Sequence, residues 1–173
     1  MTAIRTAAAA AATGALLAAG ALPAADPAQA SIPVCGNNSF LISATPAQGA
    51  TGHGSFVLLF RNTTTASCSI YGYPGLDALT ATGHVLAHAT RTRYGFAGGS
   101  RHGIQNVTVT AGHYASATVE WMNFNPVTSG ACTYSDKIEV TPANTHTAAE
   151  LPVKVSVCAL QVHPTVAGTT GLN

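Results

Sequence analysis

The chain has 173 residues, of which 8% are charged and 47% are apolar. Seven Lys and Arg residues against six Asp and Glu give a net charge of +1, which argues against the dense basic surface that nucleic-acid binding requires. The apolar content and the scarcity of charge also argue against a disordered chain, and the length fits one domain.

Residues 1–30 have the pattern of a secretory signal peptide. Arg5 is the only charge before a long Ala/Leu stretch, and the segment ends in the small-x-small motif Ala28-Gln29-Ala30. Glycines and a proline interrupt the stretch, so it is too short for a membrane span. We therefore expect cleavage after Ala30 and a secreted or envelope-associated domain over 31–173. No transmembrane segment is expected in that mature chain.

The four cysteines, Cys35, Cys68, Cys132 and Cys158, all follow the expected leader. An even number of cysteines in an exported domain predicts two disulfides, with three possible connectivities. We prefer Cys35–Cys68 and Cys132–Cys158, because each pair brackets a turn-rich segment and would tie the open end of a hairpin. Zinc binding is disfavoured, since no two cysteines have C-x₂₋₄-C spacing, and a lipid anchor on Cys35 is disfavoured because small residues do not precede it.

Alternation of apolar and polar residues predicts β-strands through the rest of the chain. The pattern is clearest over 115–121, where Trp121 is the largest expected core residue and Glu120 is expected to face outward. Similar strands are expected over 104–110 and around 138–140, and the apolar run 56–60 fits a central strand. Short strands with regular turns predict an all-β sandwich or barrel.

Three further segments give expectations about local structure. Tyr73, Pro74 and Gly75 suit a structural type II turn, with the proline at the second position and the glycine at the third. Val153, Val155 and Val157 alternate as a strand, so Cys158 needs a bulge or a strand end to reach the same face. The Gly/Thr-rich tail 166–173 is expected to be disordered.

The most distinctive segment chemically is the loop 91–102, which has three arginines, two aromatic residues and no acid. A loop of this kind can bind an anionic envelope polymer, with an aromatic ring stacked on a sugar. The alternative is a surface loop whose arginines only maintain solubility. The candidate binding residues are Arg91, Arg93, Tyr94, Phe96, Arg101 and His102.

The chain offers little support for catalysis. A hydrolase using Ser100 and His102 is the enzymatic alternative, but the segment around Ser100 misses the G-x-S-x-G motif and precedes a strand. His84 and His88 lie four apart on an expected strand, too far apart for one metal ion. We expect the histidines to face solvent, and we expect no catalytic residue, metal or cofactor.

The segment Cys68-Ser69-Ile70-Tyr71-Gly72-Tyr73-Pro74-Gly75-Leu76 carries a family resemblance. Together with the order of the four cysteines, the Asn62-Thr63 strand end and the pattern over 107–117, it resembles the secreted actinobacterial family of domain of unknown function 4232. The resemblance covers 35–165. It implies an exported Ig-like β-sandwich and no known reaction, with no family catalytic residues to assign.

These features predict a secreted, non-catalytic β-sandwich that acts as a binding or interaction module in or outside the cell envelope. The partner is unknown, and an anionic envelope polymer or a protein are both candidates. Besides the hydrolase, the alternative is a structural protein that assembles through an exposed strand edge or the apolar β-surface.

Overall fold

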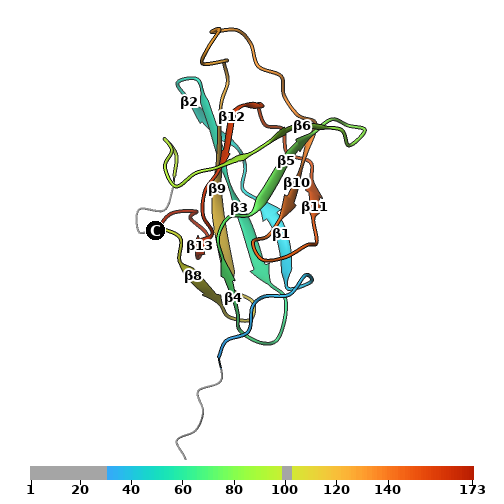
Figure 1. Ribbon diagram of the computed structural model, residues 1–173, viewed down its shortest axis with the longest axis vertical. Helices are drawn as coiled ribbons and strands as arrows, with labels where there is room; N and C mark the ends of the chain where they lie inside the picture. Colours follow the sequence, from blue (N-terminus) through green and yellow to red (C-terminus); the bar gives the residue numbers. More distant parts are fainter. Residues whose placement is uncertain (1–30, 99–102) are drawn as a thin grey trace, which may run out of the picture. The chain divides into compact units, whose positions relative to one another are not determined.

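The computed structural model describes residues 31–98 and 103–173, and Ser31–Asn173 form one compact unit. The expected signal peptide, residues 1–30, lies outside the described residues, as do Ser100, Arg101 and His102 of the candidate loop. The described residues contain strands and turns but no helix (Figure 1). None of their elements is therefore a helix long and apolar enough to cross a membrane.

The largest sheet has seven strands, in the order β1-β3-β9-β12-β7, with β2 added beside β3 and β13 beside β9. All its pairs are antiparallel except β7 with β12. Its strands are β1 (Phe40–Ala44), β2 (Gln48–Ala50), β3 (His53–Asn62), β7 (Thr90–Arg91), β9 (Tyr114–Met122), β12 (Cys158–Val162) and β13 (Val166–Ala167).

Two smaller antiparallel sheets complete the fold. The first has the order β11-β10-β5-β6, and the second pairs β4 with β8. Their strands are β4 (Cys68–Tyr71), β5 (Gly75–Leu79), β6 (Val85–His88), β8 (Asn106–Val109), β10 (Lys137–Thr141) and β11 (Ala149–Leu151). Apolar residues of all three sheets form one core, which makes the architecture a β-sandwich.

The core confirms the main strand predictions. On β3, alternate residues such as Phe56, Leu58 and Phe60 are buried, and the strand lies between β1 and β9 as a central strand. Trp121 on β9 is buried in the core, and its indole Nε1 donates a hydrogen bond to Asn123 Oδ1 at 2.9 Å. The predicted strands over 104–110 and 138–140 correspond to β8 and β10.

The disulfides are Cys35–Cys68 and Cys132–Cys158, as preferred from the sequence. Cys35 is fully engaged in its bridge, and no cysteine of the described residues is free. β12 begins at Cys158, and its register against β9 shifts just after that residue, between Cys158 and Gln161, where Ala159 has a φ of 48°. The fold class predicted from the sequence, an all-β sandwich with two disulfides, is confirmed.

Three local predictions were wrong. The residue with positive φ near Tyr73 and Pro74 is Gly72, at 103°, whereas Gly75 pairs with Thr141 as the first residue of β5 and is therefore extended rather than at the third position of a type II turn. Residues 152–155 form no strand; β12 begins only at Cys158.

The third correction concerns the tail. Val166 and Ala167 form β13 and pair with Ser116 and Ala115 of β9. Gly171 is buried, and its amide donates a hydrogen bond to Ser116 Oγ at 3.0 Å. The tail is ordered because side chains of β9 supply hydrogen-bond partners to its backbone, and these partners are far from it in sequence.

Candidate functional site

The candidate site is built on the face of β9 that points away from the core. Ser116, Thr118 and Glu120 alternate with the core residues of this strand, yet all three are buried. The prediction that Glu120 faces solvent was therefore wrong, since the carboxylate-bearing residue is only 2% exposed. The physical reason is that two other parts of the chain cover this face.

The first covering segment is Arg93–Gly98, which we call the strap. It crosses β9 so closely that added methyl groups at Gly95 and Gly98 would overlap the Glu120 carboxylate and the Thr118 side chain. The backbone amide of Ala97 donates a hydrogen bond to Glu120 Oε2 at 2.8 Å. Glycine at these positions therefore lets the strap pass directly over the strand.

The second covering segment is the ordered tail, residues 166–173. Thr118 Oγ1 donates a hydrogen bond to the Gly171 carbonyl at 3.0 Å, and a methyl group at Gly171 would overlap Thr118. Together with the bond from Gly171 to Ser116, this fixes the tail beside the strap. Each polar residue on this face of β9 thus binds the backbone of a covering segment.

His163 lies beside Glu120, next to the start of the strap. It is 0% exposed, so the prediction that the histidines face solvent was wrong for this residue, which follows β12 and contacts Thr92 and Glu120. Its Nδ1 lies 3.0 Å from the Thr92 carbonyl oxygen, and because a carbonyl can only accept, Nδ1 carries a proton. Its Nε2 lies 3.3 Å from Glu120 Oε1, at ion-pair distance but without the alignment of a hydrogen bond.

The surroundings of Glu120 favour the carboxylate over the neutral acid. Burial alone would raise the pKa of Glu120, but His163 and the backbone amides of Ala97 and Phe96 outweigh it, and the pKa lies below its usual value. A carboxylate here accepts the hydrogen bond that the Ala97 amide of the strap donates. The buried Glu120 side chain therefore holds the strap in place.

The strap presents the candidate binding residues to solvent. Tyr94 is 70% exposed and Phe96 is 52% exposed. Arg93 Nη2 donates a hydrogen bond to the Tyr94 hydroxyl at 3.1 Å, and its guanidinium carbon lies 5.2 Å from the centre of that ring. Arg91 is exposed on β7, which precedes the strap. The structure thus brings together Arg93, Tyr94 and Phe96 of the six predicted residues and places Arg91 nearby in the chain.

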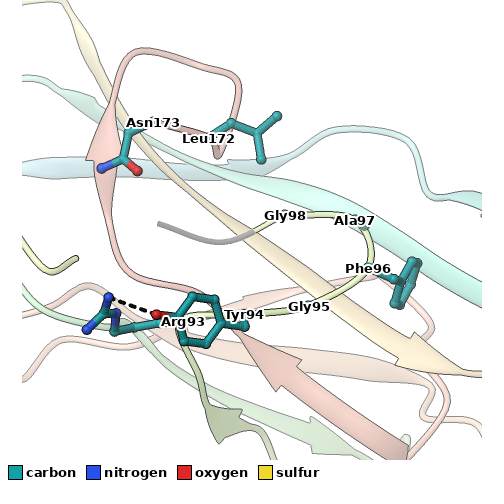
Figure 2. A pocket seen from close by; sticks show the side chains of 8 residues that line it. All are labelled: Arg93, Tyr94, Gly95, Phe96, Ala97, Gly98, Leu172 and Asn173. Carbon is teal, nitrogen blue, oxygen red and sulfur yellow. Dashed lines mark hydrogen bonds between the residues drawn. The ribbon is translucent and has the colours of Figure 1, made fainter. Parts of the chain in front are cut away.

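A groove of about 490 Å³ lies beside the strap. Figure 2 shows Arg93 and Tyr94 on one side of it and Leu172 and Asn173 of the tail on the other. Arg93 is the only charged side chain among the described residues that line it. The groove is therefore suited to an anion and to an apolar ring face rather than to a cation.

The described residues give no support for a metal centre. They contain no group of three or more His, Cys, Asp or Glu side chains that could hold an ion. His88 Nδ1 lies 2.7 Å from Asp77 Oδ1. This pair is at the surface, on β6 and β5, which belong to a different sheet from β9. The tail residues and Glu120 were missed from the sequence, because an alternating strand gives no sign that loops cover its polar face.

Comparison with known proteins identifies a family. A family model described as a domain of unknown function (DUF4232) matches residues 35–169, which is most of the chain. No curated protein and no solved structure matches the chain.

Proposed function

Because the chain belongs to the DUF4232 family, which is defined without an assigned activity, we propose its function from the site itself. We propose that the protein is an exported, non-catalytic module that binds an anionic glycan of the cell envelope. The strap and the groove beside it form the contact surface. Arg93 binds the acidic group, and Tyr94 stacks on a neighbouring sugar ring.

The observation behind this proposal is that the exposed strap is fixed to β9. Arg93 and Tyr94 stand on a backbone that is fixed to β9 by the bond from Ala97 to Glu120. A loop that is already ordered loses less conformational entropy when it binds a ligand, which favours affinity. An arginine forms charge-assisted hydrogen bonds with phosphate or carboxylate oxygens, and both are available in acidic glycans.

Export is supported by two independent features. Residues 1–30 have the composition and cleavage motif of a signal peptide. The two disulfides also favour an oxidising compartment, where such bonds persist. Expression of the full chain in a bacterial host tests this: the proposal expects a product in the medium or envelope fraction whose first residue is Ser31. An intact product retained in the cytoplasm contradicts it.

The binding proposal is tested with two acidic polymers that differ in their anionic group. Poly(glycerol phosphate) carries phosphates and polygalacturonate carries carboxylates, so calorimetry with both identifies the preferred anion. Arg93→Ala is expected to weaken binding about tenfold and to flatten its dependence on salt, because one charge-assisted contact is lost. Lys154→Ala is the matched control, since Lys154 is exposed and does not line the groove.

Two results contradict the proposal. One is a wild-type protein that binds neither polymer at low salt. The other is an Arg93→Ala variant that binds like the wild type while Lys154→Ala weakens binding, because the contact surface then lies elsewhere.

A further inference from the structure

The strap has a second side, and a different hollow lies there. Figure 2 shows the rings of Tyr94 and Phe96 projecting in opposite directions, with Phe96 pointing away from Leu172 and Asn173. Phe96 also lines a hollow of about 180 Å³ with residues of β2 and β3. We call it the β2 hollow, and its lining is Gln48, Gly49, Ala50, His53, Ser55 and Phe96.

Strand register explains why these side chains meet. Gln48 of β2 lies directly opposite Ser55 of β3, and Ser55 lies directly opposite Glu120 of β9. Directly opposed residues point to the same face of a sheet. Gln48 and Ser55 therefore continue, across the sheet, the row in which Glu120 holds the strap.

The lining of the β2 hollow is chemically unlike that of the arginine groove. It contains no Asp, Glu, Lys or Arg. Within the part of the chain that the structure describes, the Gln48 amide and the Ser55 hydroxyl have no hydrogen-bond partner. An amide and a hydroxyl can each donate and accept, which matches the hydroxyl groups of an uncharged sugar.

The aromatic residue of the hollow, Phe96, packs against His53. The centre of the Phe96 ring lies 4.1 Å from that of His53, and Phe96 is still half-exposed. A ring held by a neighbour presents apolar area at a small cost in side-chain entropy. The C–H face of a pyranose can stack on such a ring while its hydroxyls reach Gln48 and Ser55.

We propose that the β2 hollow is a subsite for an uncharged pyranose, next to the arginine groove that takes the acidic unit. This inference rests on the proposed function and narrows it to glycans in which acidic and neutral sugars adjoin. Phe96 lines both the arginine groove and the β2 hollow, so the two sites adjoin across the strap. Adjoining sites suit neighbouring sugars of one glycan chain.

The test compares two acidic probes in calorimetry with the purified protein. Hyaluronan oligosaccharides alternate a uronic acid with an uncharged N-acetylated sugar, whereas every unit of polygalacturonate is acidic. The double variant Gln48→Ala/Ser55→Ala is expected to bind hyaluronan about tenfold more weakly than the wild type, because two hydrogen bonds are lost. Its affinity for polygalacturonate is expected to stay within twofold of the wild type.

Gln105→Ala/Thr108→Ala is the matched control, because it also removes one exposed amide and one exposed hydroxyl. Gln105 precedes β8 and Thr108 lies on β8, and neither residue lines the hollow. It is expected to bind both probes like the wild type. Unchanged hyaluronan binding by Gln48→Ala/Ser55→Ala overturns the subsite and leaves the proposed function standing, provided that the wild type binds polygalacturonate. A wild type that binds neither probe nor poly(glycerol phosphate) overturns both.

Discussion

The two faces of β9 are both buried, but they are buried for different reasons. The inner face carries Ala115, Ala117, Val119 and Trp121, which pack into the core shared by the three sheets. The outer face carries Ser116, Thr118 and Glu120, whose polar atoms bind the strap and the tail. One face is thus held by apolar contact and the other by a few directional bonds.

The inner face of β9 therefore determines mainly the stability of the fold, and the outer face determines mainly how the strap is positioned. Apolar packing is shared among many contacts, so damage to the inner face weakens the whole fold. Each bond of the outer face fixes one point of a covering segment, so damage there frees that segment first. Function, as proposed above, depends on the strap and is therefore most sensitive to the outer face.

The largest effect is expected from Trp121→Ala on the inner face. Removal of this buried side chain should lower the free energy of unfolding by about 4 kcal/mol, through lost burial and the cavity left against Phe56. Urea unfolding followed by circular dichroism measures it. Binding of polyanions by the fraction that remains folded should be unchanged, and a loss below about 1 kcal/mol would contradict the account of the inner face.

A smaller loss of stability, with a larger loss of binding, is expected from Glu120→Ala on the outer face. The variant leaves His163 buried without its partner and removes the acceptor for the Ala97 amide. The free energy of unfolding is expected to fall by about 2 kcal/mol, because the Ala97 amide loses its acceptor. Hydrogen exchange at the Ala97 amide should become faster, and binding to the acidic probes should fall.

Glu150→Ala is the control for this variant. Glu150 Oε2 accepts a hydrogen bond from Lys137 Nζ at 2.8 Å, but the pair is exposed and should contribute less than about 1 kcal/mol. If Glu120→Ala costs no more than Glu150→Ala and exchange at Ala97 stays slow, then Glu120 does not hold the strap.

The inner face could be predicted from the sequence and the outer face could not. Alternation over 115–121 identifies the strand and the core residue Trp121, because burial of apolar residues with period two is a local property. Whether Glu120 meets water depends on the strap, which lies more than twenty residues away in the chain. Hydrogen bonds between distant segments leave no periodic signal.

The same reasoning applies to the binding residues. The cluster of arginine and aromatic residues in 91–102 was visible because it is contiguous, and Arg93, Tyr94 and Phe96 do stand together on the strap. The β2 hollow was not visible, because Gln48 and Ser55 meet Phe96 only through the register of β2, β3 and β9. Among the paired cysteines, by contrast, the bracketed turns were enough to favour the correct connectivity.

The smallest effect is expected from acidification, which changes a single proton on the outer face. The pKa of Glu120 is lower in the folded protein than its usual value, so the carboxylate binds protons less readily there than in the unfolded chain. Its stabilising contribution is therefore complete above the unfolded pKa of about 4.3 and is lost as the pH falls through the folded pKa. Urea unfolding of the wild type and of Glu120→Gln between pH 6 and pH 3 isolates this contribution, because other carboxylates titrate in both proteins. The stability advantage of the wild type should shrink toward pH 3, and an advantage that grows on acidification would show that the neutral acid, not the carboxylate, holds the strap.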